Sequence, residues 1–471
     1  MEHTFIGLDV GTQGARAILT DEHGHMLASH SEHFPLSGAS REEQSPDEWW
    51  AACERLLTRL LQQPAAAKLR AIGVTSTSGT IIPIDANGQP LHPAIMYSDG
   101  RQAEEGKRCK ALAEKYHPEG YTAFNTTSGL PKMVWFAEQF PEKAARLYKF
   151  IHAADFITGK LTGNFNVTDF TNVLKSGYDV ANERWPEYIW GHLPLKSEWL
   201  QQVIPSGAPI GEVTVKLPGM PDNVIVTAGM TDGCASQIAS GAVTPGAWNT
   251  TIGTTLVVKG VTEKPVHDPL GRLYNHRHPQ GYWMPGGASN TGADWIPKHF
   301  GINLEELNQQ AAALIPTGKL YWPLEQAGER FPFIAPQAKA FAAADLEGPE
   351  KFAAGMEGVA YIEKMAYEMI ESLSGETVKA VYTAGGASNS SLWLRIRASV
   401  LGVPVHKMQE VSGAAGAAIL AASQTHYSSI IEAAAAMAHI EKTILPESGL
   451  TEAYKEGYQL FREKLKDKGY A

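Results

Sequence analysis

One local pattern occurs twice in this sequence, and it constrains the fold more than any other feature. Apolar runs flank a polar, glycine-bearing turn in FIGLDVGTQGARAILTD, residues 5–21, and again in AWNTTIGTTLVVKG, residues 247–260. Each segment predicts two strands joined by a turn. Because a chain of 471 residues is too long for one hydrophobic core, the repetition predicts a second domain that begins as the first does.

The order of the expected elements differs from the strict strand–helix alternation of a dehydrogenase. A helix at 46–61 has the clearest start, because Ser45 fits the N-cap, Pro46 the first helical position and Glu48 the capping-box position. No GxGxxG fingerprint follows the first strand, which argues against a dinucleotide-binding fold. The other expected elements are strands at 5–10, 15–20, 26–31, 69–76 and 81–85, and a mainly helical section at 102–161.

These elements indicate an α/β protein with two domains and a short hinge. We place the first domain at residues 1–243 and the second at residues 244–430, since the second hairpin begins after Thr244. Residues 431–471 are expected to form a C-terminal helical cap. The two glycine-bearing turns are expected to face each other across a cleft and to hold one polyphosphate from both sides.

The composition argues against several classes of protein. A net charge of −10 argues against nonspecific nucleic-acid binding, and no apolar run reaches the roughly 20 residues of a membrane span. We expect no signal peptide, because strand-like residues begin almost at once. The three cysteines, Cys53, Cys109 and Cys234, lack metal-like spacing and indicate a reducing cytoplasm.

The first turn has the residue types of an anion site. Backbone N–H groups in a glycine turn converge on phosphate, which suits Gly11, Thr12, Gln13 and Gly14. Asp9 ends the preceding strand, where its carboxylate can face a Mg²⁺ ion directly or through water. The alternative is a tight hairpin with a structural aspartate.

Two further loops strengthen the nucleotide hypothesis. Gly253, Thr254 and Thr255 form the second turn. In TAGGASNSSLW, Gly385 and Gly386 lie between an expected strand and helix and leave room for a base or ribose, with Asn389 available to hydrogen-bond. Three such loops in this order are more specific evidence of a nucleotide-binding protein than any one of them.

These segments resemble the FGGY family of carbohydrate kinases over nearly the whole chain. The resemblance is carried by IGLDVGTQGARAI, EQSPDEWW, PLHPAIMYSDGR, AGMTDGCASQIASGA, TTIGTT, GERFPF and TAGGASNSSLWLRI. It implies a two-domain α/β fold of the actin-like ATPase (ribonuclease H-like) type with an interdomain cleft, and ATP and Mg²⁺ as cofactors. Within the family the chain is similar to pentulose kinases, and more narrowly to compact ribulokinase-like members through GARAI, TSTSGT, TDFTNVLKSGYD and NHRHPQGYWMPGGASN.

The resemblance implies that Asp232, in AGMTDGCASQ, is the catalytic base. Phosphoryl transfer to an alcohol needs a carboxylate that accepts the hydroxyl proton, and Asp232 lies between an expected buried strand and a helix of small residues. The alternative is that Asp232 caps that helix, and the two roles are compatible.

The resemblance places the sugar at the loop that follows the 69–76 strand. Ser78 and Gly79 stand there in place of the bulkier Met-His pair of xylulokinases, which favours a ribulokinase-like specificity. Asp99 in YSDGR matches another segment of the sugar side, where a structural ion pair with Arg101 is the alternative. Thr168 and Asp169 either line the same cavity or cap a loop.

Other polar and aromatic residues are given structural interpretations. Glu329 and Arg330 in GERFPF are expected to hold a wall of the cleft. His276 and His278 would share one strand face, but no third ligand is evident, so a metal site is not expected. Trp283, Trp295 and Trp322 are core candidates, one of which could rest against adenine.

The sequence therefore predicts a cytoplasmic kinase that transfers phosphate from ATP to a terminal hydroxyl of a small sugar. A ketopentose, D-ribulose or D-xylulose, is favoured, with another ketose or a polyol as the alternative. A different class, an actin-like ATPase switch without a sugar substrate, is disfavoured because no client-binding domain is evident. No segment indicates a symmetric interface, so both monomer and homodimer stay open.

Overall fold

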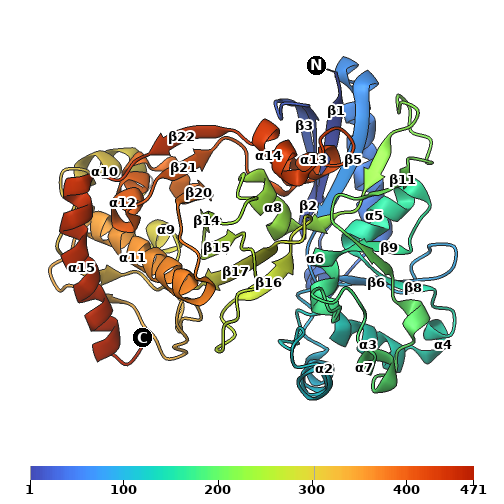
Figure 1. The fold of residues 1–471 in the computed structure, drawn as a ribbon, viewed down its shortest axis with the longest axis horizontal. Coiled ribbons are helices and arrows are strands. Elements are labelled where there is room, and N and C mark those ends of the chain that lie inside the picture. The colour runs from blue at the N-terminus through green and yellow to red at the C-terminus, as the bar shows by residue number, and fades with distance from the viewer. Residues whose placement is uncertain (1, 302) are drawn as a thin grey trace. The chain divides into compact units, whose positions relative to one another are not determined.

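The computed structural model describes residues 2–301 and 303–471, which form two compact units (Figure 1). Unit 1 contains the described residues up to Gly241, together with residues 276–281 and 410–438. Unit 2 contains residues 242–275, 282–409 and 439–471. In the part of the chain that the structure describes, no helix is both long and apolar enough to cross a membrane.

The central sheet of unit 1 is mixed: β3, β2 and β1 pair antiparallel, β1, β5 and β12 pair parallel, and β11 at the far edge pairs antiparallel with β12. Its strand order is β11-β12-β5-β1-β2-β3. Strand β1 pairs antiparallel with β2 and parallel with β5, so β1 lies at the change of direction. The bounds are β1 Thr4–Val10, β2 Gly14–Asp21, β3 Met26–His33, β5 Leu69–Ser76, β11 Pro209–Glu212 and β12 Ile225–Thr227.

Side-chain alternation along β1 explains why both faces of this sheet are covered. Ile6 and Leu8 point to one face and join the apolar core that includes helix α1 (Pro46–Leu61). The predicted bounds of this helix are confirmed, and Ser45 is its N-cap, with the side chain accepting from Glu48 N at 3.4 Å. Helix α5 (Ala153–Thr162) also contributes to this core.

The opposite face of the sheet is covered by helix α13 (Gly413–Ala422), which lies beside β1 and β5 in Figure 1. Glycines allow the close approach: a Cβ at Gly7 would lie 1.9 Å from Ala414 O, and one at Gly73 would lie 2.1 Å from Ala417 O. The structure therefore differs from the predicted boundaries, because residues 410–438 return to unit 1. Helix α14 (Ile430–Met437) belongs there as well.

A second layer of unit 1 surrounds the carboxyl end of β5. A four-stranded sheet has the order β4-β7-β6-β8, and a two-stranded sheet joins β9 to β10. The predicted helical section at 102–161 is confirmed, interrupted by β8. The bounds are β4 Glu43–Gln44, β6 Ile81–Ile84, β7 Ala94–Ile95, β8 Lys149–His152, β9 Val167–Asp169, β10 Gln202–Ile204, α2 Ala103–Tyr116, α3 Gly129–Gln139, α4 Pro141–Ala144, α6 Phe170–Val173 and α7 Tyr188–Gly191.

The main sheet of unit 2 repeats the strand order of unit 1. It contains the path β17-β15-β14-β20-β21-β22, in which β14 pairs antiparallel with β15 and parallel with β20. Strand β14 therefore occupies the position that β1 has in unit 1, as the repeated hairpin predicts. The bounds are β14 Ala247–Ile252, β15 Leu256–Gly260, β17 Trp283–Ser289, β20 Ala380–Ala384, β21 Val405–Met408 and β22 Ile440–Ile444.

Long helices and aromatic residues form the core of unit 2. Helices α11 (Gly348–Ser374), α12 (Ser391–Leu401) and α15 (Ser448–Asp467) contribute to one apolar cluster, which also contains Trp295 and Trp322. A buried ion pair lies within it: Arg397 donates to both carboxylate oxygens of Glu363 at 2.7 Å, and to Thr383 Oγ1 on β20. Smaller helices are α9 (Trp295–His299) and α10 (Leu304–Ala311).

Candidate active site

Asp232 is the exposed first residue of helix α8 (Asp232–Ala239). The preceding strand, β13 (Met230–Thr231), pairs parallel with the end of β5, so that Thr231 lies opposite Ser76. Thr231 is the N-cap of the helix, and Asp232 Oδ1 accepts from Gly233 N at 2.6 Å. The carboxylate of Asp232 is thus presented at the carboxyl edge of the sheet, with Thr231 rather than Asp232 at the capping position.

Asp9 lies near Asp232 at the same edge of the sheet. It is opposite Thr75 in the register of β1 with β5, and it is half-buried. Burial, and next the negative charge of Asp232, raise the pKa of Asp9 to about 6, against the opposing effect of Arg16. Gly413 leaves room for this carboxylate, since a Cβ there would lie 2.5 Å from Asp9 Oδ2. The structure therefore brings together the two aspartates for which the sequence predicts catalytic and metal-binding roles.

The turn after β1 is held in place by neighbouring side chains. Gly11 N donates to Gly14 O at 2.9 Å, which closes the turn. Gln44 Nε2 donates to Thr12 O at 3.0 Å, and Thr12 Oγ1 lies 3.5 Å from Tyr97 Oη. Gln13 is exposed at the tip. The first glycine turn, which is part of the predicted phosphate site, therefore lies at the carboxyl edge of the unit 1 sheet and is held there by hydrogen bonds.

The loop after β5 requires glycine at position 79. Gly79 has a φ of +77°, and a Cβ there would lie 2.2 Å from Thr127 O. Both facts disfavour any larger residue. Ser78 beside it is half-buried, and its Oγ accepts from Lys175 Nζ at 3.1 Å.

Asp99 is buried beside this loop with its carboxylate oxygens engaged by its own neighbours. Arg101 Nε lies 3.0 Å from both oxygens, and Gln102 Nε2 donates at 2.8 Å. Burial acts to raise the pKa of Asp99, but these hydrogen bonds hold it below its usual value. Arg101 also donates to Glu43 at 2.7 Å. Asp99 and Arg101 therefore form the ion pair that the sequence offers as an alternative. Contact between Asp99 and the substrate stays a prediction.

Asp169 caps helix α6, which is hydrogen-bonded to the strand that precedes Asp232. Its buried carboxylate accepts from Thr171 N at 2.7 Å, Asn172 N at 3.3 Å and Ser206 Oγ at 2.6 Å. Thr171 Oγ1 in turn accepts from Thr231 N, next to Asp232, at 2.8 Å. Asp169 therefore has the capping role that the sequence offers as an alternative to lining the cavity. Thr168 beside it is buried.

Sequence reasoning missed a second group of residues near Ser78. Lys175 lies in a short 3₁₀ segment, η3 (Leu174–Ser176), and Lys132 is fully buried in α3. Ser176 Oγ lies 3.0 Å from His152 Nε2, whose Nδ1 is 2.9 Å from Asp155 Oδ2. Because Ser176 has no exposed surface, this Ser–His–Asp arrangement holds η3 in place rather than presenting a nucleophile. A lysine within the otherwise apolar run LPKMVWF is the signal that could have drawn attention to this region.

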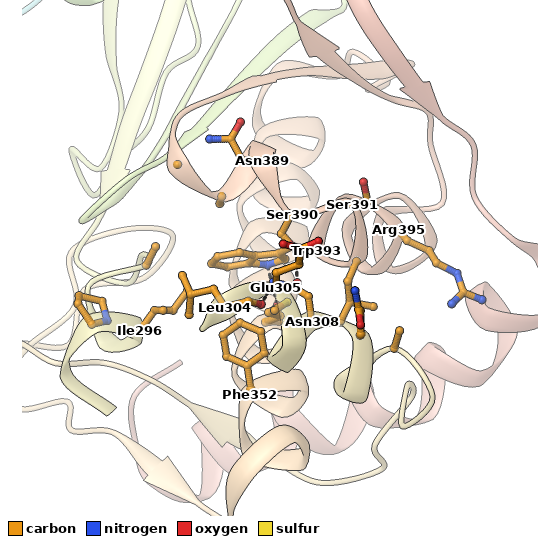
Figure 2. A pocket seen from close by; sticks show the side chains of 18 residues that line it. Ile296, Leu304, Glu305, Asn308, Phe352, Asn389, Ser390, Ser391, Trp393 and Arg395 are labelled. Atoms are coloured by element: carbon orange, nitrogen blue, oxygen red, sulfur yellow. Dashed lines mark hydrogen bonds between the residues drawn. The ribbon is translucent and has the colours of Figure 1, made fainter. Parts of the chain in front are cut away.

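Unit 2 contains a cavity of about 940 Å³ between α10, α11 and the start of α12. Figure 2 shows the rings of Trp393 and Phe352 among its lining side chains. Gly386 and Asn389 line it from η5 (Gly386–Asn389), directly after Gly385. Ser390 Oγ donates to Asn308 Oδ1 at 2.5 Å across the wall. Trp393, rather than Trp283, Trp295 or Trp322, is the tryptophan that faces this space.

The second glycine turn also lies in unit 2, between β14 and β15. Gly253 N donates to Thr255 O at 3.0 Å, and Gly253 O accepts from Ala293 N at 2.8 Å. Thr254 is exposed at the tip. Like the first turn, this turn is closed by a backbone hydrogen bond.

Glu329 and Arg330 form hydrogen bonds with neighbouring residues of unit 2. Buried Glu329 accepts from Ser289 Oγ at 2.7 Å, Asn290 N at 2.7 Å and Thr291 Oγ1 at 2.8 Å. Arg330 Nε donates to Ala288 O at 2.9 Å. His276 and His278 are buried, and within residues 2–301 and 303–471 no cluster of three or more His, Cys, Asp or Glu side chains is arranged to hold a metal ion.

Comparison with known proteins gives the class of the protein. Residues 4–239 match the N-terminal domain of the FGGY family of carbohydrate kinases, and residues 248–425 match its C-terminal domain. The chain is 26% identical to the xylulose kinase of Escherichia coli over 97% of this chain and 98% of that protein. It is 24% identical to the gluconokinase of Bacillus subtilis over 85% of this chain and 83% of that protein. The crystal structure of a xyloylose kinase from Brucella ovis superposes with a TM-score of 0.87 at 23% identity, covering 98% of each chain.

The fold and the family matches define the class of protein as a phosphotransferase with the two-domain α/β architecture of actin-like ATPases. The chain belongs to the FGGY family of carbohydrate kinases. The predicted family, fold class and enzyme class are thereby confirmed.

Proposed function

We propose that the protein transfers the γ-phosphoryl group of ATP to a terminal hydroxyl of a small sugar, with a ketopentose, D-xylulose or D-ribulose, as substrate. The observation that carries the proposal is the exposed carboxylate of Asp232 at the start of α8, beside Asp9. The similarity to xylulose kinases supports a pentulose. The three cysteines are buried and form no disulfide, which supports a reducing, cytoplasmic location.

In this proposal Asp232 is the general base. A carboxylate held at a helix start and open to solvent accepts the proton of the sugar hydroxyl as the oxygen attacks phosphorus. Ser78 and Gly79 bound the sugar on the side of β5, and Asp99 is assigned to the same side. Because Ser78 follows Ser76, which lies opposite Thr231, these residues share the edge that presents Asp232.

The carboxylates also fit a magnesium ion. Mg²⁺ prefers hard oxygen ligands and is usually held by one or two carboxylates together with substrate phosphates. Asp9 would hold it, directly or through water, and Asp232 contributes negative charge nearby. When bound, Mg²⁺ neutralises charge on the phosphates. A cation bound at Asp9 would offset the burial and the repulsion from Asp232 that raise the pKa of this carboxyl group.

We assign nucleotide-binding roles to the glycine turn of unit 1 and, separately, to the glycine turn and the cavity of unit 2. The backbone N–H groups of Gly11, Thr12 and Gln13, and those of Gly253, Thr254 and Thr255, bind phosphate oxygens. The adenosine occupies the cavity, where Gly385 and Gly386 leave space and Asn389 hydrogen-bonds. The cavity supports this assignment because its walls are mostly apolar and include the indole of Trp393.

Filling this cavity is expected to weaken ATP binding. Gly386 lines the cavity, and no atom lies within 4 Å of the position of its Cβ. The substitution Gly386→Val should therefore fold normally while occupying ligand space, and raise the KM for ATP by about tenfold. The matched control is Gly38→Val, since Gly38 is also the first residue of a 3₁₀ segment with open space around its Cβ. Equal KM values for the two variants would contradict the adenosine assignment.

A coupled assay of ADP release over pentuloses, hexuloses, polyols and sugar acids tests the proposed function. We expect the highest kcat/KM with D-xylulose or D-ribulose. A higher value with another ketose or a polyol would keep the reaction and replace the substrate. ATP hydrolysis that no sugar stimulates would instead support the actin-like switch. Sedimentation of the same sample decides between monomer and homodimer.

A further inference from the structure

The side chain of Lys175 lies on the same edge of unit 1 as Asp232. Two independent connections establish this placement. Lys175 Nζ donates to Ser78 Oγ at 3.1 Å, and Ser78 follows Ser76, which lies opposite Thr231 in the sheet. On the other side, Thr171 Oγ1, in the helix that leads into η3, accepts from the backbone N–H of Thr231 at 2.8 Å.

The segment that carries Lys175 is fixed rather than free to turn away. Ser176, the next residue, is buried, with its Oγ 3.0 Å from His152 Nε2. Asp155 holds the other ring nitrogen of His152 at 2.9 Å. Because the backbone here is already anchored, ligand binding to Lys175 needs no further ordering of the segment that carries it.

A second lysine makes the same place electropositive. Lys132 is fully buried, and its Nζ donates to Thr126 O and to Ser128 O. Burial, with a further contribution from Lys175, lowers the pKa of Lys132 to about 7, although Asp99 acts in the opposite direction. The positive charges of Lys132 and Lys175 disfavour each other, and an anion bound at Lys175 would reduce this repulsion.

We propose that Lys175 is a specificity residue that pairs with a substrate carboxylate, so that the kinase accepts sugar acids, the polyhydroxy carboxylates of five or six carbons, in addition to neutral ketoses. The inference rests on the proposed function and adds a substrate class to it. Ser78 Oγ and Lys175 Nζ together offer one hydroxyl and one ammonium to the carboxylate oxygens, which is a charge-assisted contact.

The charges of the site also determine how such an acid lies. Asp232 and Asp9 repel a carboxylate, and the lysines attract it, so the acid binds with its carboxylate at Ser78 and its far hydroxyl at Asp232. The hydroxyl oxygen then forms a bond to the γ-phosphorus, the bond from that phosphorus to the ADP oxygen breaks, Asp232 takes the hydroxyl proton, and the carboxylate is unchanged.

The experiment compares kcat/KM for a panel of four- to six-carbon aldonates, including D-xylonate and D-gluconate, with kcat/KM for D-xylulose and D-ribulose. The wild-type protein is expected to phosphorylate at least one aldonate. Lys175→Met should lower the ratio of the aldonate to the ketose kcat/KM by about 10- to 100-fold, the loss expected for a hydrogen bond between charged groups. Lys175→Arg should restore most of that ratio.

Lys110→Met is the matched control, because Lys110 is exposed on α2 and its removal changes the net charge equally. It should leave both kcat/KM values unchanged. A wild-type protein that phosphorylates ketoses but no aldonate, or a Lys175→Met ratio equal to that of Lys110→Met, would overturn the inference and leave the proposed function standing. Absence of turnover with every ketose and acid would instead reject both.

Discussion

Asp232→Ala is expected to reduce sugar phosphorylation by at least about 10³-fold while leaving ATP affinity nearly unchanged. A general base raises the rate of the reaction by about 10²- to 10⁴-fold. Asp232 is the acidic residue in the first turn of helix α8, so the variant has no carboxylate there to replace it. The side chain is exposed, so its removal leaves no cavity and the fold should be retained. The measurements are kcat/KM by ADP release in the presence of sugar, and the Kd for ATP by calorimetry.

Two further variants give this experiment its controls. Asp232→Asn keeps the shape and removes the charge, so it should be nearly as inactive as Asp232→Ala. Asp222→Ala removes an exposed carboxylate from a loop of the same unit and should behave as wild type. Turnover by Asp232→Ala within tenfold of the wild-type value would show that another group accepts the proton.

Arg397→Met is expected to have the largest effect on stability, because it leaves the carboxylate of Glu363 buried without its cation. Both side chains have no exposed surface, and Arg397 also donates to Thr383 Oγ1, so the pair joins α12, α11 and β20. Breaking a buried pair from one side costs about 3–5 kcal/mol. The free energy of unfolding of unit 2, followed by hydrogen exchange in α11 and α12, should fall by this amount.

Arg395→Met provides a control on the same helix. Arg395 also forms an ion pair, with Glu447, but that pair is substantially exposed, and such pairs contribute about 0–1 kcal/mol. The double variant Arg397→Met/Glu363→Leu removes both charges and should be less destabilised than Arg397→Met alone. If Arg397→Met and Arg395→Met lose equal stability, the buried pair does not have the role that its burial indicates.

Local sequence signals were enough to predict several elements of the fold. The helix at 46–61 was predicted to its last residue because Ser45, Pro46 and Glu48 mark its start and apolar residues follow at helical spacing. The repeated hairpin predicted the second domain, and both sheets do place that hairpin at the change from antiparallel to parallel pairing. These signals are contained in short stretches of chain, so no distant contact is needed to interpret them.

The return of residues 410–438 to unit 1 could not be predicted in the same way. The helix at 413–422 is rich in alanine, and the sequence does not indicate its partner because small residues pack against any closely approaching surface. Only the tertiary structure shows that Gly7 and Gly73 provide that surface. The same holds for Lys175, whose position beside Ser78 depends on a hydrogen bond between residues that are far apart in the sequence.

The sequence by itself therefore determined the family, the two-domain α/β fold and the chemistry for which Asp9, Thr12 and Asp232 are proposed, because those properties reside in motifs of a few residues. The tertiary structure decided which charges lie close together: Asp9 with Asp232, Arg397 with Glu363, and Lys132 with Lys175. Electrostatic interactions depend on distance and burial in space, and neither is recorded by position along the chain.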